Sequence, residues 1–176
     1  MSKEHRLHIA LEQLDEVIGI YVSSLDLYTM EQLRYKPTAD KWSLGEMYDH
    51  IINAALNIYF PAIIKCKNEP KEDATSKTQA GEEIFKLGAY PDKKVKNTMG
   101  SPKAPNDKQQ LYDGLGKIKV KAHDMLPTVI TAQPEAKVMH PRLGALNAEE
   151  WFLLVGMHLR HHLRQKEELE RTYISL

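Results

Sequence analysis

The segment NAEEWFLLVGMHLRHHLRQKEEL, residues 147–169, holds the pattern that decides the fold. Six of its positions recur at spacings of 4, 3, 4, 3 and 4, which is the period of one face of a helix packed in a bundle. These positions are Trp151, Val155, His158, His162, Gln165 and Leu169. The first four residues form a capping box, in which Asn147 caps the helix and Glu150 reaches back to it. The segment is therefore a helix whose inward face is half polar, and that polarity needs a cause.

Three further segments repeat this spacing with apolar residues on the inward face. They run from Ser2 to Ser24, from Ser43 to about Lys67, and from about Asn106 to Leu126, and each begins at its expected N-cap. The inward positions of the second segment are Leu44, Met47, Ile51, Ala54 and Ile58. We expect Pro61 to kink this helix and Pro127 to end the next one, because proline lacks an N–H and clashes with the preceding turn.

Two long connections join these helices, and neither shows the alternation of a strand. Residues 68–105 are rich in Lys, Thr, Gly and Pro, with a short helical pattern at about Gln79–Leu87. We interpret this stretch as one crossover, because neither flank has enough helices for a core of its own. The other connection spans Thr128–Leu146. A long crossover lets the second and third helices run parallel, so the sequence predicts an all-α, up-down-down-up four-helix bundle forming a single domain over residues 1–176.

The composition excludes several classes of protein. The 24 Lys and Arg balance the 24 Asp and Glu, whereas a dedicated nucleic-acid-binding protein normally carries a basic excess. One cysteine, Cys66, cannot form an internal disulfide or a multi-cysteine metal site, and we expect it to be a buried, inert thiol. The chain has neither an apolar run long enough to span a membrane nor a signal-peptide core. We therefore expect a cytoplasmic protein that acts on a small molecule and binds neither nucleic acid nor membrane.

Three of the eight histidines are predicted to face one another inside the bundle. His158 and His162 lie four residues apart, so both imidazoles project from the same inward face. His50 lies on the inward face of the second helix, 7 residues from its start, while His162 lies 9 residues before Arg171 near the end of the last helix. Antiparallel helices would place them at the same height. Three protein ligands with an open position are typical of a catalytic metal site, although imidazoles paired through water remain an alternative.

The other candidates have weaker arguments from spacing. Gln165 follows His162 by three residues on the inward face and could orient its imidazole. Glu46 precedes His50 by four residues and is a second candidate, although its role in the capping box of Ser43 is favoured. We expect the remaining histidines to be peripheral, although His140, in the proline-containing connection, could reach the mouth of the site: His5, His8, His123, His140 and His161.

Three ordered motifs resemble those of the DinB-like superfamily, which includes YfiT-type metal-dependent hydrolases and bacillithiol S-transferases. Trp42–His50 resembles its Trp-Ser-x-x-Glu-x-x-x-His segment, and His140–Leu146 resembles its His-Pro-x-x-Gly-x-Leu turn. His158–Gln165 resembles its His-x-x-His-His-x-x-Gln signature. The resemblance implies a four-helix bundle, often a homodimer, with zinc or nickel held by the residues that match its three histidines, namely His50, His158 and His162.

The resemblance describes the site more closely than the reaction. Characterised relatives include S-transferases and an isomerase that use low-molecular-weight thiols, and others are known only as stress-inducible proteins. Metal-dependent hydrolysis usually requires a nearby carboxylate base, and the inward face beside His158 and His162 offers none. We therefore favour a metal-dependent thiol S-transferase acting on small electrophiles. A metal-dependent hydrolase that uses a metal-bound water and a non-enzymatic metal-binding stress protein remain the alternatives.

Overall fold

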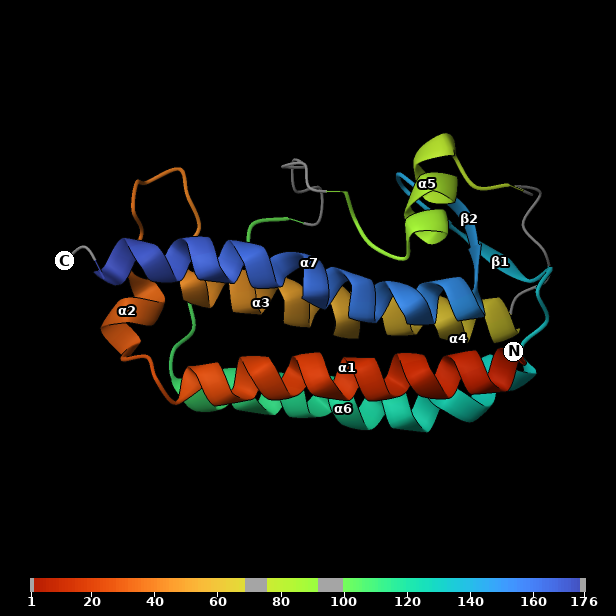
Figure 1. The fold of residues 1–176 in the computed structure, drawn as a ribbon, viewed down its shortest axis with the longest axis horizontal. Helices are drawn as coiled ribbons and strands as arrows, with labels where there is room; N and C mark the ends of the chain where they lie inside the picture. Colours follow the sequence, from red (N-terminus) through yellow and green to blue (C-terminus); the bar gives the residue numbers. More distant parts are fainter. Residues whose placement is uncertain (1, 69–75, 92–99, 175–176) are drawn as a thin grey trace.

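Four long helical rods form the molecule in the order up-down-down-up. The structure, a computed structural model, describes residues 2–68, 76–91 and 100–174. The first rod is α1 (Lys3–Leu25), and the second consists of α3 (Leu44–Ala54), the π-helix η1 (Ala55–Tyr59) and α4 (Phe60–Asn68). The third and fourth rods are α6 (Lys108–Thr131) and α7 (Ala148–Ile174). In Figure 1 the second and third rods run in one direction and α1 and α7 in the other, which confirms the predicted topology.

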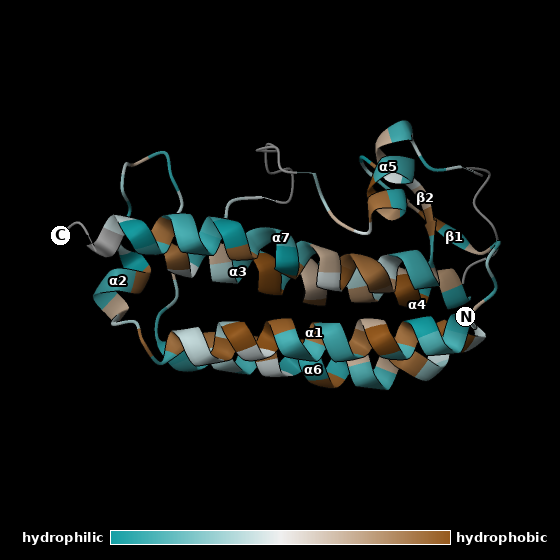
Figure 2. Cartoon of the chain, viewed as in Figure 1, coloured by the Kyte–Doolittle hydropathy of each residue, from teal (hydrophilic) through white to brown (hydrophobic). Residues whose placement is uncertain are grey.

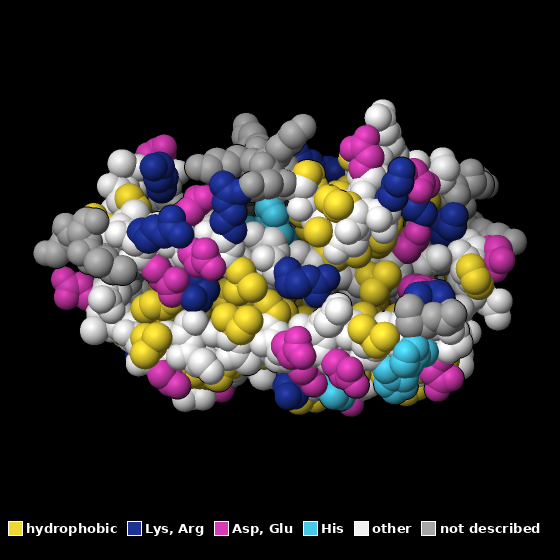
Figure 3. Space-filling model, viewed as in Figure 1, with side chains coloured by type: hydrophobic (Ala, Val, Ile, Leu, Met, Phe, Trp, Pro, Cys, Tyr) yellow, Lys and Arg dark blue, Asp and Glu magenta, His cyan; other side chains and the backbone are white. Residues whose placement is uncertain are grey.

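The rods pack as two pairs around one apolar core. α1 lies against α6, while the rod containing α3 and α4 lies against α7, and α1 also contacts α7 (Figure 1). The apolar faces turn inward, as the hydropathy colours in Figure 2 show. Both signs of charge are interspersed over the visible surface in Figure 3, as expected for a chain without net charge. Within the described ranges, no helix is long and apolar enough to cross a membrane.

Short elements fill the connections. The predicted helix in the crossover is present as α5 (Gln79–Leu87), whereas α2 (Met30–Arg34) was not foreseen. The expectation that the last connection lacks strands is wrong, because β1 (Lys137–His140) and β2 (Gly144–Asn147) form an antiparallel hairpin. Their four-residue length is too short for an alternating pattern to stand out in the sequence. Residues 69–75 and 92–99 of the predicted crossover lie outside the described residues.

At the N-termini of the four rods, three of the four predicted capping residues are confirmed. Ser2 caps α1 and Ser43 forms its capping box with Glu46, while Asn147 exchanges two hydrogen bonds with Glu150 at the start of α7. The fourth prediction is wrong by one residue, because Asp107, not Asn106, caps α6 by accepting from the Gln110 N–H. Asp is as good a cap as Asn, so composition alone does not separate the two.

Pro127 acts differently from the prediction, whereas the helix resumes beyond Pro61 and runs to Asn68, as expected. Pro127 does not end α6, which continues to Thr131 and buries Val129 completely, so tertiary packing outweighs the missing hydrogen bond. Near Pro61 the helix widens into the π-turn η1, where the Phe60 N–H donates to the Ala55 carbonyl. A widened turn accommodates a residue that cannot donate and would clash with the preceding turn. The turn adds one residue to the helical phase, so Tyr59 is fully buried where Ile58 was expected to face inward.

Candidate metal centre

Three histidines from two rods meet in the core. α3 contributes His50 and α7 contributes His158 and His162, and all three are at most 8% exposed. The Nε2 atom of His158 lies 3.1 Å from Nε2 of His50 and 3.0 Å from Nε2 of His162. Among the described residues, this is the one group of three His, Cys, Asp or Glu side chains whose ligand atoms lie within 4.8 Å of one another. The structure therefore brings together the three histidines that the helical spacing selected.

Burial keeps these imidazoles neutral, which is the form that binds a metal. Together with a smaller effect of neighbouring histidines, it lowers the pKa of His50 to about 4 and that of His162 to about 3. The pKa of His158 is lowered well below its usual range for the same reasons. Neutral imidazole offers one lone pair to a cation, and all three lone pairs can be directed at one point.

The spacing of the nitrogens fits a divalent ion. Nitrogens about 2.0–2.1 Å from a tetrahedral zinc ion lie roughly 3.4 Å from one another, a few tenths of an ångström more than the two distances seen here. Three nitrogen donors leave at least one coordination position for another ligand. The donor set and its geometry therefore fit a divalent transition-metal ion with an open position.

The outer sides of the ligands have different surroundings. Gln165 Oε1 lies 2.6 Å from His162 Nδ1, the contact expected for a side chain that orients this imidazole. The indole ring of Trp42 packs on His50 with 4.8 Å between ring centroids. Glu46 is occupied elsewhere, since its carboxylate accepts from the Ser43 N–H and pairs with Lys36 at 3.1 Å. The capping role favoured for Glu46 is therefore present.

Three aromatic residues near His158 were not predicted as part of the site. Tyr59 and Tyr90 lie with ring centroids 5.6 and 6.1 Å from that of His158, and Trp151 lies 5.9 Å from Tyr59. The helical spacing does not predict an inward Tyr59, because the π-turn shifts the helical phase by one residue. Tyr90 follows α5 in the crossover, where no periodicity marks it, and its ring lies over both His158 and His161. Tyr90 therefore packs against the His158 side of the cluster.

The remaining histidines are mostly peripheral, as predicted. His5 and His8 are exposed, and His123 is hydrogen-bonded to Asp15 on the surface. His161 is half-buried against Tyr90.

His140 differs from this expectation because it is buried at the end of β1. Its Nδ1 accepts from the backbone N–H groups of Arg142 and Leu143, and its ring packs on Trp151. The hairpin that buries it was not visible in the sequence.

Cys66 lies apart from the cluster. Its side chain is buried, and its thiol hydrogen-bonds the Leu146 carbonyl in the strand β2. This agrees with the prediction of a buried thiol. Any thiol that reacts at the cluster would have to come from outside the protein.

Fold and site together define a class of protein: a four-helix bundle with a buried three-histidine cluster of metal-ligating geometry. This chain belongs to the DinB superfamily, whose family model matches residues 13–165. The superfamily predicted from the three motifs is therefore confirmed.

Two comparisons extend this assignment. YuaE of Bacillus subtilis (strain 168), described as an uncharacterized protein, is 24% identical over 155 residues, which are 81% of this chain and 88% of YuaE. The solved structure of YfiT from Bacillus subtilis superposes with a TM-score of 0.64, covering 98% of this chain and 90% of YfiT, at 17% identity. YfiT is described as a probable metal-dependent hydrolase with an unusual four-helix bundle topology. At this identity the likeness to YfiT shows the fold alone.

Proposed function

We propose that this protein is a metal-dependent enzyme that transfers a low-molecular-weight thiol to a small electrophile. The observation that carries the proposal is the composition of the cluster. Among the described residues, the one group of side chains placed to hold a metal ion consists of His50, His158 and His162. This group contains neither a carboxylate nor a thiolate. A site of neutral ligands leaves the full charge of the ion for an anionic co-substrate and provides no obvious general base.

This composition suits thiol chemistry. A divalent ion held by the three histidines would act as a Lewis acid that lowers the pKa of a bound thiol and so favours its thiolate form. In the transfer, the sulfur forms a bond to the electrophilic carbon, the bond from that carbon to its leaving group breaks, and the thiol proton passes to solvent. The chain's own residues contribute orientation and exclusion of water: Gln165 orients His162, and Tyr90 packs against the His158 side of the cluster. Zinc or nickel as the ion and a homodimer as the assembly are parts of the same proposal.

Metal-dependent hydrolysis is the second candidate. Its support is the description of the structurally similar YfiT as a probable metal-dependent hydrolase. Hydrolysis would need a group that accepts the proton of the attacking water. His161, half-buried beside His162 at 5.2 Å between ring centroids, is a titratable side chain outside the trio that could do so. We rank this candidate second because no carboxylate belongs to the cluster.

The first experiment is metal analysis of protein purified without chelators, beside the His50→Ala, His158→Ala and His162→Ala variants. We expect one divalent ion per chain in the wild type and loss of the ion in each variant. A wild type without stoichiometric metal would overturn the proposal and favour histidines paired through water.

The second experiment separates the reactions. The metal-loaded protein is incubated with a fluorogenic alkylating reagent and a panel of low-molecular-weight thiols, and separately with a panel of ester and amide substrates. Metal-dependent conjugation supports the transferase. Hydrolysis without conjugation overturns it in favour of the second candidate, and a metal-loaded protein inactive in both assays indicates a metal-binding protein without enzymatic activity.

A further inference from the structure

The two histidines that α7 contributes to the cluster differ in the surroundings of their Nδ1 atoms. Nδ1 of His162 meets Gln165 Oε1 at 2.6 Å. Nδ1 of His158 is completely enclosed and has no hydrogen-bond partner. A neutral imidazole that binds a metal through Nε2 carries its proton on Nδ1, so this nitrogen becomes an obligatory donor when the ion is bound. An unpaired donor in the core lowers the stability of the protein, so we expect an acceptor for it close by.

Two other buried polar atoms belong to a chain of rings that starts at His158, in which Tyr59 packs on His158 and Trp151 packs on Tyr59. The Trp151 indole N–H is buried without a hydrogen-bond partner, and the Tyr59 hydroxyl makes no hydrogen bond of normal geometry. The polar neighbour of the Tyr59 hydroxyl is the Tyr90 hydroxyl, toward which it donates, so its oxygen keeps its capacity to accept. The Tyr59 ring contacts the rings of His158 and Trp151, both on α7. Its centroid lies 5.6 Å from that of His158 and 5.9 Å from that of Trp151. Three polar atoms without a hydrogen bond of normal geometry, on three adjoining rings, are better explained by a shared interaction than by three separate losses.

Chemistry selects the acceptor among them. An indole N–H can only donate, whereas a phenol oxygen can accept and donate. Of Tyr59 and Trp151, only Tyr59 can therefore accept a hydrogen bond from the Nδ1–H group of His158. A single buried water that accepts from His158 and Trp151 and donates to the Tyr59 oxygen would satisfy all three atoms.

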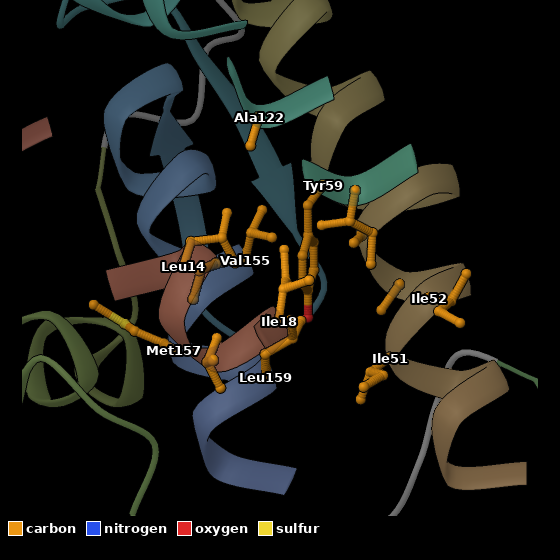
Figure 4. Close-up of a cluster of buried hydrophobic side chains, with 14 of the residues drawn as sticks. Leu14, Ile18, Ile51, Ile52, Tyr59, Ala122, Val155, Met157 and Leu159 are labelled. Carbon is orange, nitrogen blue, oxygen red and sulfur yellow. The ribbon is translucent and has the colours of Figure 1, made fainter. Parts of the chain in front are cut away.

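The local backbone is shaped to put Tyr59 in this place. Without the π-turn η1, the regular spacing would turn Ile58 inward and rotate Tyr59 away from α7. In Figure 4 the Tyr59 side chain runs into the core between the helix that carries Val155 and Leu159 and the helix that carries Ile51 and Ile52. π-turns inside α-helices occur frequently at functional sites, and this one turns a fully buried tyrosine ring toward the ring of His158.

We propose that Tyr59 is the positioning residue for His158, receiving the hydrogen bond of its Nδ1–H through one buried water that Trp151 also bonds. Tyr59 thereby does for His158 what Gln165 does for His162, and the two together fix the ring orientations of both ligands on α7. The inference rests on the proposed metal site, since the Nδ1 donor becomes obligatory when an ion occupies Nε2.

The test is the zinc affinity of Tyr59→Phe, measured by competition with a chelator of known affinity, together with the melting temperature of the metal-free protein. We expect zinc binding about 10- to 100-fold weaker than in the wild type, the usual effect of removing a partner from a metal-bound histidine. The metal-free melting temperature should fall only slightly, because the hydroxyl's polar neighbour there is the Tyr90 hydroxyl, without a hydrogen bond of normal geometry. A tyrosine that only fills space would lose neither property on conversion to phenylalanine.

Tyr48→Phe is the matched control. Tyr48 is also fully buried, but its hydroxyl donates to the Tyr21 carbonyl at 2.9 Å, away from the cluster. Its removal should lower the metal-free melting temperature and leave the zinc affinity unchanged. The two phenylalanine variants should therefore show opposite patterns.

The outcomes separate this inference from the proposed function. A wild type that binds zinc and a Tyr59→Phe variant that binds it equally well would overturn the role of Tyr59 and leave the metal site intact. A wild type that binds no zinc would overturn both. Should Tyr59→Phe not fold, Trp151→Phe, which removes one donor of the shared interaction and keeps an aromatic ring, should weaken zinc binding by a smaller factor; an unchanged affinity there would also contradict the inference.

Discussion

The two helix pairs of the bundle are built on one pattern but serve different purposes. The α1–α6 pair buries an almost wholly apolar surface, with Ser24 as its one buried polar residue among those described. The α3–α7 pair buries His50, His158 and His162 at the equivalent inward positions, and Lys166 is buried beside them on the repeat's flank. The inward repeat thus determines which side chains lie in the core. An apolar side chain at such a position stabilises the fold, whereas an imidazole there forms part of the site.

The largest expected contrast between the pairs is in metal binding. His158→Ala removes the nitrogen that lies closest to both others, at 3.0 and 3.1 Å, so we expect complete loss of stoichiometric metal. His123→Ala, a change to an exposed histidine on α6, should keep one ion per chain. Elemental analysis of both purified variants checks this, and metal retained by His158→Ala would contradict the three-histidine site.

Acid should act through buried histidines on the α3–α7 side of the molecule. Burial lowers the pKa of His50 and His140 to about 4 and that of His162 to about 3, so the unfolded chain takes up protons first as the pH falls below about 6.5. The stabilisation is present above that pH and is lost as the pH drops toward 4. We expect each of these histidines to remove roughly 2 kcal/mol from the unfolding free energy of the metal-free protein between pH 7 and pH 5. Urea unfolding at several pH values measures the loss, and a stability independent of pH in this window would contradict it.

The contrast also shows what could be predicted from sequence. Both pairs follow the same spacing, so the rods, their order and the inward place of His50, His158 and His162 could be predicted from periodicity and two capping boxes. Gln165 lies on that same face. Such features depend on neighbours within one or two helical turns.

The missed features depend on contacts between distant segments. Tyr59 faces inward because a π-turn shifts the phase by one residue, and Tyr90 reaches the cluster from a connection without periodicity. His140 is buried because a hairpin folds against α4 and α7. α6 passes Pro127 because burial of Val129 holds the helix together. In each case tertiary packing overrides the local signal, and a single sequence carries little record of it.

In the α1–α6 pair, a smaller core side chain should lower the stability of the fold without affecting metal binding. Leu115 on α6 is fully buried, so Leu115→Ala should lower the unfolding free energy by about 2–5 kcal/mol through lost burial and the cavity left behind. The folded variant should still bind one metal ion. On the same helix Val120 is 61% exposed, and Val120→Ala should change stability by less than about 0.5 kcal/mol. Denaturant unfolding with metal analysis tests both, and loss of metal from folded Leu115→Ala would show that the two pairs are not separable.

The smallest expected effect lies within the α3–α7 pair and concerns the orientation of one ligand. Gln165 Oε1 meets His162 Nδ1 at 2.6 Å, so its carbonyl oxygen accepts the proton that the metal-binding tautomer carries there. Gln165→Leu removes this acceptor at similar volume and should weaken zinc binding about 10- to 100-fold. Gln165→Glu keeps an acceptor oxygen, and its charge makes the hydrogen bond stronger, so zinc binding should be equal to that of the wild type or tighter. Chelator competition measures both affinities. If both variants weaken zinc binding to the same extent, the role of Gln165 is packing, and the orientation of His162 must come from the α7 backbone itself.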